Sequence, residues 1–329
     1  MTELLTVSDL AVSFGEVRAV RGVSFGVAEA TTLAIVGESG SGKSLSSLAV
    51  LGLLPAQAQV TAGSIHWDGR DLRACGADEL RQLRGTDIAM IFQDPLSALN
   101  PSLTVGYQIG EMFRRRRGLG RDEARRRAIE AMTEVGIPDA ARRAGSYPHE
   151  FSGGMRQRVM IAMALALDPR LLIADEPTTA LDVTVQAQIL RLLRKRQRDG
   201  LAMIIISHDL GVVARTAQSV VVMYAGRAVE SGPVADLYTV PAHPYTLGLM
   251  AASPSARDAG RRPQPIDGYP PDGAALPTGC AFHPRCPFAR QRCRTEDPEL
   301  RTVAPGRTSA CHFAEEVLSR GGAVGHPRA

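Results

Sequence analysis

Short apolar runs alternate with longer segments of helical period along much of this chain. The runs have the length of buried strands, and a polar residue follows most of them: residues 32–36, 88–92, 171–174, 203–206 and 220–223. Residues 43–54 repeat apolar positions at helical spacing. This alternation predicts an α/β fold with a largely parallel sheet flanked by helices. Ligands of such sheets bind at the carboxyl ends of the strands, so the polar residues there are the candidates for chemistry.

Two segments depart from this pattern. Residues 95–153 consist of helical segments without an apolar strand between them, which predicts a helical insertion into the sheet domain. After about residue 253, Pro, Gly and Arg dominate through residue 277 and regular periodicity fades. We therefore expect a linker or loop-rich segment that leads to a cysteine-bearing tail.

Composition and charge narrow the class of protein. The chain has 329 residues, of which 44% are hydrophobic and 22% charged, as in ordinary soluble globular proteins. No apolar run reaches the length of about 18 residues that spans a membrane. The N-terminal segment lacks the basic start and apolar core of a secretory signal, which predicts a cytoplasmic location.

The charge pattern argues against nucleic acid as a partner. The formal net charge is only +4, which is small for a nucleic-acid-binding surface. Arginine clusters at residues 114–117, 125–127 and 191–198 lie in helical patterns with acids nearby. We interpret them as solvated helix faces.

A glycine-rich segment follows the first predicted strand and precedes a predicted helix. It fits the pattern G-x-x-x-x-G-K-S/T with Gly37, Glu38, Ser39, Gly40, Ser41, Gly42, Lys43 and Ser44. Its glycines let backbone N–H groups turn toward phosphate oxygens, and the helix N-terminus favours negative charge. We expect Lys43 to reach the β- and γ-phosphates of a nucleotide and the Ser44 hydroxyl to bind Mg²⁺.

Two adjacent acids, Asp175 and Glu176, end the apolar run at residues 171–174. Neighbouring carboxylates repel each other unless a cation lies close by, so the pair predicts a magnesium site. We expect Asp175 to belong to the Mg²⁺ shell and Glu176 to act as the general base on the attacking water. His208, which follows the strand at residues 203–206, is expected to contact the γ-phosphate.

A second anion site is predicted at Ser152, Gly153 and Gly154, because they precede a helical segment at residues 156–167. The sequences FSGGMRQR, LLIADEP and TALD between residues 151 and 182, together with the phosphate loop, Gln93 and His208, resemble the motifs of ATP-binding cassette (ABC) ATPases. The resemblance implies a P-loop NTPase domain at residues 1–255 with an antiparallel β-subdomain and a helical subdomain at about residues 96–165. A small loop-rich extension would occupy residues 256–329.

The resemblance also implies roles for single residues. Gln93 would sense Mg²⁺ and the attacking water, Phe14 would stack on adenine, and residues 94–103 would contact a membrane partner. Ser152, Gly153, Gly154 and Asp182 would close over the ATP of the opposite subunit, which makes the functional unit a dimer. Met155 stands where the family usually has Gln. This departure leaves the backbone donors of the motif intact.

Four cysteines, Cys280, Cys286, Cys293 and Cys311, lie in the tail, and Cys75 stands apart. Structural disulfides are not expected in the cytoplasm, and four thiolates suit zinc or an iron–sulfur cluster. The spacings match neither usual pattern, so the residues leave iron–sulfur, zinc and no metal open. His283 and His312 are substitute ligands only for zinc. The tail and the preceding AHPYTLGLM resemble the extension of oligopeptide and dipeptide importer ATPases, which implies a 4Fe–4S cluster.

The leading hypothesis is the ATP-hydrolysing subunit of a bacterial peptide importer, bound peripherally to the cytoplasmic face of the inner membrane. Its partners would be two integral membrane permease subunits, an extracytoplasmic solute-binding protein and a second ATPase, identical or different. Nickel, glutathione or another small solute is the alternative cargo. A soluble, non-transport ABC ATPase and a catalytically inactive regulator are the rival classes. Tandem cassettes or long coiled-coil insertions would favour the first rival, and neither is found; the full set of catalytic residues opposes the second.

Overall fold

The structure is a computed structural model that describes residues 3–179, 181–253 and 264–321. Two compact units make up the chain: unit one comprises Met1–Val27, Thr32–Ala74 and Ile206–Ala329, and unit two comprises Ala28–Thr31 and Cys75–Ile205. Of the helices within the described ranges, none combines the length and the apolar character needed to cross a membrane.

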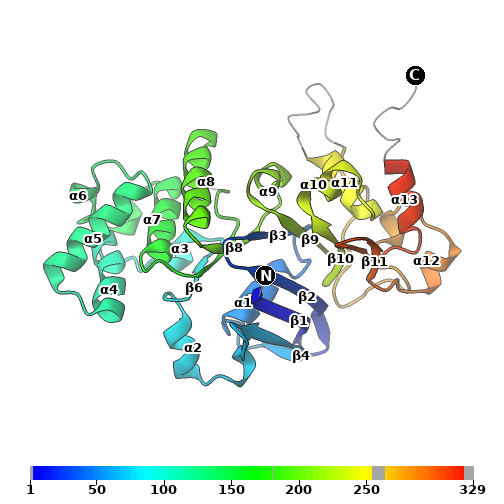
Figure 1. Ribbon diagram of the computed structural model, residues 1–329, viewed down its shortest axis with the longest axis horizontal. Coiled ribbons are helices and arrows are strands. Elements are labelled where there is room, and N and C mark those ends of the chain that lie inside the picture. The colour runs from blue at the N-terminus through cyan, green and yellow to red at the C-terminus, as the bar shows by residue number, and fades with distance from the viewer. Residues whose placement is uncertain (1–2, 180, 254–263, 322–329) are drawn as a thin grey trace. The chain divides into compact units, whose positions relative to one another are not determined.

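Unit one contains an antiparallel sheet with the strand order β2-β1-β4-β5 (Figure 1). The strands are β1 (Glu3–Phe14), β2 (Val17–Ala28), β4 (Ala58–Trp67) and β5 (Arg70–Asp71). Buried and exposed positions alternate along much of β1, because only one face of this sheet packs on the core. This sheet corresponds to the antiparallel β-subdomain that the resemblance implied.

The second sheet of unit one has the order β11-β12-β10-β9-β3. Its strands are β3 (Thr32–Val36), β9 (Ser219–Tyr224), β10 (Arg227–Pro233), β11 (Arg301–Ala304) and β12 (Arg307–Ser309). β3 pairs with β9 in parallel, and β10 pairs antiparallel with both β9 and β12. Every residue of β3 is buried, as a continuous apolar run predicts.

Short helices accompany this sheet. They are α1 (Lys43–Val50), η1 (Leu72–Ala74), α9 (Leu210–Thr216), α10 (Val234–Thr239), α11 (Pro244–Ala252), η3 (His283–Arg285), α12 (Gln291–Thr295) and α13 (Ala314–Gly321). The tail is thus more regular than the expected loop-rich extension, since β11 and β12 add to the sheet beside β10. Residues 254–263 and 322–329 of the predicted extension lie outside the described residues.

Unit two contains parallel strands that are buried among helices. The strands are β6 (Ile88–Ile91), β7 (Leu171–Asp175) and all of β8 (Ala202–Ile206) but its last residue. The helices are α2 (Ala77–Leu83), α3 (Pro95–Ala98), α4 (Val105–Arg117), α5 (Arg121–Glu134), α6 (Ala140–Arg143), η2 (Pro148–Glu150), α7 (Gly153–Leu165) and α8 (Val183–Arg198). Residues 95–153 are all described and contain helices but no strand, as predicted.

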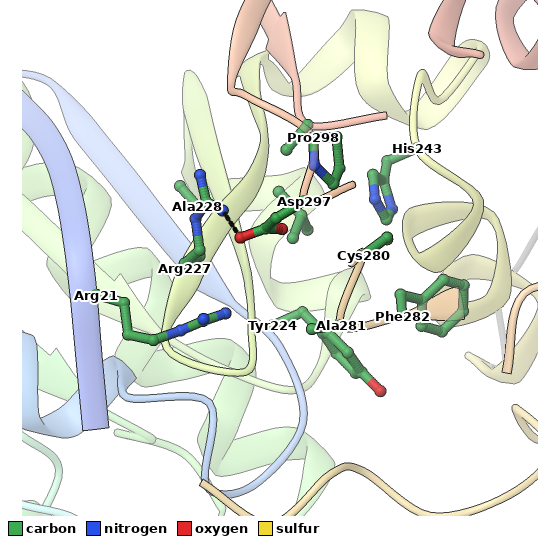
Figure 2. Close-up of a pocket in the computed structure, with 12 residues that line it drawn as sticks. Arg21, Tyr224, Arg227, Ala228, His243, Cys280, Ala281, Phe282, Asp297 and Pro298 are labelled. Carbon is green, nitrogen blue, oxygen red and sulfur yellow. Dashed lines mark hydrogen bonds and ion pairs between the residues drawn. The ribbon is translucent and has the colours of Figure 1, made fainter. Parts of the chain in front are cut away.

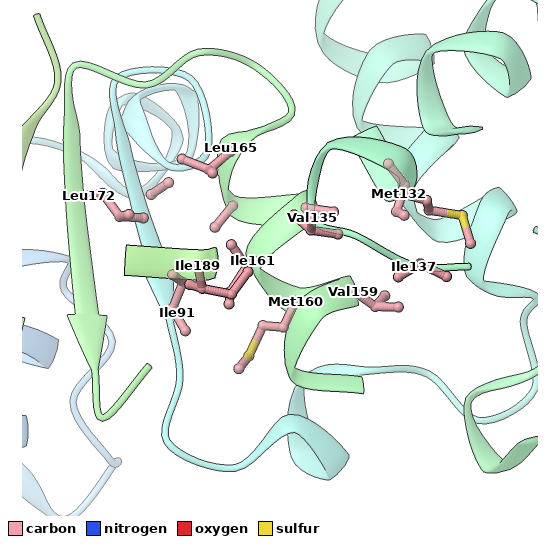
Figure 3. Close-up of a cluster of buried hydrophobic side chains, with 14 of the residues drawn as sticks. Ile91, Met132, Val135, Ile137, Val159, Met160, Ile161, Leu165, Leu172 and Ile189 are labelled. Carbon is pink, nitrogen blue, oxygen red and sulfur yellow. The ribbon is translucent and has the colours of Figure 1, made fainter. Parts of the chain in front are cut away.

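The core of unit two joins its helices to its strands. Figure 3 shows Ile161 of α7 close to Ile91 of β6 and Ile189 of α8, all at most 1% exposed. The same cluster extends to Met132 at the end of α5. α7 is therefore anchored in the core along its length, which fixes the position of its N-terminus.

The arginine clusters on α4 and α5 lie mainly on exposed helix faces, as predicted, whereas Arg196 of the third cluster is half-buried between Glu134 and Asp168. Arg115 pairs with Glu111 one turn earlier on α4, at 2.7 Å. On α5, Arg126 and Arg127 both pair with Glu123. Exposed pairs of this kind add little to stability, because solvent screens them.

Candidate functional site

The glycine-rich segment of unit one forms a turn between β3 and α1 that only glycine permits. Gly37, Gly40 and Gly42 have φ of 152°, 77° and 95°. A Cβ atom at Gly37 would lie 2.2 Å from the carbonyl oxygen of Met223, and one at Gly42 would lie 2.8 Å from that of Ala19. At Gly37 and Gly42 positive φ and close backbone contact both disfavour a side chain, and at Gly40 the positive φ alone favours glycine.

Lys43 begins α1 and lies within the turn. Its side chain is 8% exposed, and its Nζ donates to the carbonyl oxygens of Gly37 at 2.8 Å and Glu38 at 2.7 Å. Nζ also lies 3.3 Å from Ser41 Oγ. Ser44 follows on the first turn of α1 and is half-buried. The ammonium group and the N-terminus of α1 thus face the same turn, as a phosphate site requires.

His208 of unit one lies in a tight turn after the end of β8. The turn is held by its neighbours: the Asp209 N–H donates to Ser207 Oγ at 3.0 Å, and Asp209 Oδ1 accepts from the Gly211 N–H at 2.7 Å. His208 itself is exposed. Phe14, the last residue of β1, is half-buried. Both side chains are therefore accessible to a ligand.

The predicted catalytic acids lie at one end of the strands of unit two. β6 and β7 pair in parallel with Ile91 opposite Ala174. Gln93 and Glu176 each come two residues after this pair, so the register places them at the same edge of the sheet. Asp175 is 4% exposed at the end of β7, while Gln93 is exposed and Glu176 half-buried.

Glu176 has a left-handed backbone with φ of 49°. Such a conformation is unfavourable for a residue with a side chain and costs about 1–3 kcal/mol. Its Oε2 accepts from the Thr179 hydroxyl at 3.1 Å, and its carbonyl oxygen accepts from the same hydroxyl at 3.3 Å. The backbone strain and these contacts orient the carboxylate.

The second predicted anion site lies at the N-terminus of α7. Ser152 caps this helix and accepts from the Met155 N–H at 3.3 Å. Gly153 is exposed, and a Cβ atom there would meet no atom within 4 Å. The helix begins at Gly153 rather than at residue 156, because glycines are tolerated in a first turn that Ser152 caps. Gly154 belongs to the same turn.

One contact connects α7 to the loop after β7, and a second caps α8 in the same unit. Gln157, which is buried, donates from Nε2 to the carbonyl oxygen of Pro177 at 3.0 Å, one residue after Glu176. Asp182 is exposed and caps α8 by accepting from the Val185 N–H at 3.0 Å. Of the predicted TALD segment, Ala180 lies outside the described residues.

The four tail cysteines line one small cavity of unit one, together with Phe282, Phe288 and Phe313. Burial raises the pKa of Cys286 to about 12 and that of Cys311 to about 11, and it also raises the pKa of Cys280. Without a metal these groups are protonated thiols at neutral pH. Cys75 belongs to unit two and does not line this cavity.

No single-ion site is formed by these side chains. Within the described ranges, no group of three or more His, Cys, Asp or Glu residues is arranged to hold a metal ion. His283 Nδ1 lies 3.0 Å from the Cys280 carbonyl oxygen, and His312 Nε2 lies 3.0 Å from that of Glu296. Both imidazoles thus contact the backbone. The iron–sulfur cluster stays a prediction.

Sequence reasoning did not find the residues that join the tail to β9 and β10. Figure 2 shows Asp297 of the tail directed at Arg227 of β10, with which it forms an ion pair. Buried Glu230 of β10 accepts from the N–H groups of Ala242 at 2.7 Å and His243 at 3.0 Å. Arg307 of β12 donates to the same carboxylate at 3.2 Å.

His243 provides a further buried link, and it makes stability depend on pH. Burial lowers its pKa from 6.5 to about 4, more than its hydrogen bond with the Ala310 backbone raises it. Its Nδ1 accepts from the Tyr245 N–H at 3.0 Å. Because the unfolded chain binds a proton first as pH falls, stability is lost between pH 6.5 and about 4.

We expect His243→Asn to remove this pH dependence. The Asn side chain can accept from the Tyr245 N–H but does not titrate. The variant should therefore lack the loss of about 3 kcal/mol in free energy of unfolding that His243 causes between pH 6.5 and about 4. Urea unfolding at pH 7 and pH 4.5 measures the difference. His149→Asn, at an exposed position of unit two, is the control. Its free energy of unfolding should change between pH 7 and pH 4.5 as much as that of the wild type. If His243→Asn loses as much stability as the wild type between these pH values, His243 does not cause the pH dependence.

Two features of this chain are typical of a P-loop nucleotide hydrolase. One is the glycine turn with Lys43 and Ser44 at the start of a helix, and the other is the acid pair at the end of a parallel strand. The family described as ABC transporter matches residues 20–179, and the oligopeptide/dipeptide transporter C-terminal region matches residues 229–293. The dipeptide transport ATP-binding proteins DppD of Escherichia coli K12 and Shigella flexneri are each 48% identical over 322 residues, covering 96% of this chain and 98% of theirs.

Solved structures agree with this class. The dimeric post-hydrolysis structure of the ATP-binding cassette MJ0796 with ADP and Pi is 28% identical with a TM-score of 0.64, covering 70% of this chain and 98% of its own. This chain belongs to the ABC transporter family of ATP-binding proteins. It is an ATPase of the transport-coupled class, which confirms the predicted family, fold class and enzyme class.

Proposed function

We propose that this chain hydrolyses ATP to drive the import of dipeptides or oligopeptides across the bacterial cytoplasmic membrane. The observation that carries the proposal is the tail, which matches the oligopeptide/dipeptide transporter C-terminal region and continues the sheet beside β10. The dipeptide transport names of the relatives support the same cargo. Nickel, glutathione or another small solute is the alternative cargo.

The sequence motifs support a chemical role for each residue. Lys43 and Ser44 would hold phosphate and Mg²⁺, Asp175 and Gln93 would contribute to the Mg²⁺ surroundings, and Glu176 would take a proton from the attacking water. Oxygen donors of this kind suit magnesium. The ion, bound with ATP, would neutralise charge on the phosphate oxygens. His208 contacts the γ-phosphate and Phe14 stacks on the adenine.

The second ATPase subunit binds at the surface formed by Ser152, Gly153, Gly154 and Asp182. One observation supports this role: the capped N-terminus of α7 is exposed at Gly153, where its N–H groups could bind a phosphate presented by a partner. The partner ATPase is either a second copy or a different chain.

The membrane subunits bind at residues 94–103. Asp94, Asn100 and Pro101 are exposed there. Buried Gln108 of α4 orders this segment, since its Oε1 accepts from the Asn100 N–H at 2.9 Å and its Nε2 donates to the carbonyl oxygens of Asn100 and Leu103, both at 3.0 Å. A rigid exposed segment next to Gln93 suits transmission of a permease movement to the catalytic edge.

Affinity purification from detergent-solubilised membranes tests the transport role. We expect the tagged chain to retain two integral membrane subunits and a second ATPase, at the cytoplasmic face, and a solute-binding protein when peptide is present. Uptake of labelled dipeptide by vesicles that contain the complex should require internal ATP. Retention of no membrane protein would contradict the proposal, and uptake of nickel or glutathione alone would replace its cargo.

The observation that supports a metal site in the tail is that all four cysteines line one cavity, as four thiolate ligands of a cluster or of zinc would. The resemblance of the tail to importer extensions favours a 4Fe–4S cluster over zinc. Buried thiols with raised pKa need a cationic centre to become thiolates. Cys280, Cys286, Cys293 and Cys311 would hold the cluster.

We expect anaerobically purified protein to show visible absorption and about four iron atoms per chain. Cys286→Ser should lose both, because it removes one of four ligands. Cys75→Ser, in unit two, is the matched control and should keep them. Stoichiometric zinc with no iron, or neither metal, would overturn the cluster.

A further inference from the structure

The phosphate turn is held by an arginine of the tail. Arg285 forms a two-pronged ion pair with Glu38, the second residue of the turn, with 2.6 Å from Nη1 to Oε2 and 2.9 Å from Nη2 to Oε1. The Arg285 side chain is only 5% exposed, and that of Glu38 is 26% exposed. A bidentate, shielded pair of this kind is both strong and directional.

The other donors of Arg285 are also engaged. Nε donates to the carbonyl oxygen of Asp267 at 2.9 Å, and Nη1 donates to the Tyr224 hydroxyl at 3.3 Å. The guanidinium carbon lies 5.8 Å from the centre of the Tyr224 ring. Arg285 therefore has one fixed orientation, and Glu38 takes its position from it.

The backbone of Glu38 is held from the same side. Its N–H donates to the Tyr245 hydroxyl of α11 at 2.8 Å, so this N–H binds the protein rather than a phosphate. Tyr245 packs against Tyr224 and against Phe282 of the tail, with ring centres 4.6 and 5.3 Å apart. The aromatic cluster and Arg285 thus fix the start of the turn from outside it.

Glu38 places a negative charge in a turn that binds a polyanion. A carboxylate there repels ATP unless a cation cancels its charge, and nearby charges interact strongly where water is excluded. Arg285 supplies that cation. Lys43 has a different task, since it contacts the carbonyl oxygens of Gly37 and Glu38 rather than the carboxylate.

We propose that Arg285 is a positioning residue of the nucleotide site, which neutralises Glu38 and holds the phosphate turn, so that ATP affinity depends on the folded tail. The proposal rests on the assignment of the turn as the ATP site. Arg285 directly precedes Cys286, and its N–H donates to the Phe282 carbonyl oxygen at 3.0 Å. A rearrangement of the cysteine segment is thereby transmitted to the turn.

Binding of a fluorescent ATP analogue to the full chain, with steady-state hydrolysis, tests the proposal. Arg285→Gln should weaken ATP binding about tenfold, equivalent to about 1.4 kcal/mol, and raise KM with little change in kcat. Glu38→Gln should instead tighten binding, because Arg285 remains without its counter-charge. The double variant should return to within about twofold of wild-type affinity, since the pair is again neutral.

Arg301→Gln is the matched control. Arg301 forms an equally two-pronged pair with Glu315 elsewhere in the tail, at 2.5 and 2.7 Å, and its loss should leave ATP affinity unchanged. Should Arg285→Gln fail to fold, Glu38→Gln still tests the charge argument with the tail intact. The proposal is wrong if Glu38→Gln does not bind ATP more tightly than wild type. It is also wrong if folded Arg285→Gln binds ATP as tightly as wild type, or if the double variant binds ATP as weakly as Arg285→Gln.

Lys43→Ala distinguishes a failure of the coupling proposal from a failure of the ATP-site assignment. If wild type binds the analogue and Lys43→Ala does not, the turn is the ATP site and the variants of Glu38 and Arg285 test only the coupling. If Lys43→Ala binds as tightly as wild type, the assignment of the site is wrong, and the coupling proposal is wrong with it.

Discussion

Glu176→Gln is expected to lower ATP hydrolysis by about 10²–10⁴-fold while ATP binding stays intact. The amide has the shape of the carboxylate and can still accept the hydrogen bond from Thr179. It cannot take a proton from water. Under the proposed dimer mechanism, in which hydrolysis reopens the ATP-bound pair of subunits, the variant should accumulate as a dimer with two trapped ATP molecules.

Single-turnover phosphate release and size-exclusion chromatography with ATP measure the two effects. Glu130→Gln, an exposed carboxylate on α5 of the same unit, is the control and should hydrolyse ATP as wild type does. A variant that binds ATP but neither traps it nor slows hydrolysis would show that Glu176 is not the general base.

The backbone of Glu176 makes a further comparison informative. Its φ of 49° suits glycine, so Glu176→Gly relieves strain and should not lower the free energy of unfolding. The same variant should hydrolyse no faster than Glu176→Gln. Replacing a strained functional residue lowers activity without lowering stability, whereas replacing a structural residue lowers both.

The sequence predicts the local parts of this site well. The phosphate turn depends on glycines that adopt positive φ and on Lys43 at the start of a helix, and both are properties of eight consecutive residues. The edge that brings Gln93 and Glu176 together follows from two buried strands paired in parallel. Short motifs in a strand–loop–helix context carry their structure with them.

The long-range parts escape sequence reasoning. Glu38 and Arg285 lie 247 positions apart, and neither has a local pattern that identifies a partner. β12 has only three residues, too few to show an alternation, and it is a strand because it pairs with β10. Tertiary pairing rather than propensity decides both features, so only the structure shows that the tail belongs to the nucleotide-binding unit.

Buried polar contacts fix the tail against β10. Glu230, His243 and Arg307 bury polar groups where the tail meets β10, and each finds a partner there. Although Arg307 Nε is buried without a partner among the described residues, the carboxylate of Glu230 and the imidazole of His243 are hydrogen-bonded, so these contacts favour one arrangement of the two parts. A tail fixed in this way can act on the phosphate turn through Arg285, which a flexible appendage could not do.

The largest effect expected outside the acid pair comes from Gly153→Asp. Gly153 begins α7, and its missing side chain faces open space, so Asp fits without displacing any atom. A carboxylate in the first turn stabilises an isolated helix by about 0.3–1 kcal/mol. The folded subunit should therefore be as stable as wild type or slightly more stable, and its own phosphate turn should bind ATP normally.

Hydrolysis should nevertheless fall by at least about 100-fold if the proposed dimer is correct, because the added charge would repel the partner's ATP at this helix and prevent closure. Gly153→Ala, which adds volume but no charge, should keep most of the activity. Nucleotide binding, thermal unfolding and phosphate release measured on both variants separate the effects. Loss of ATP binding by an isolated Gly153→Asp subunit would mean that α7 acts on the ATP of its own chain, and the dimer would then not be required by the chemistry.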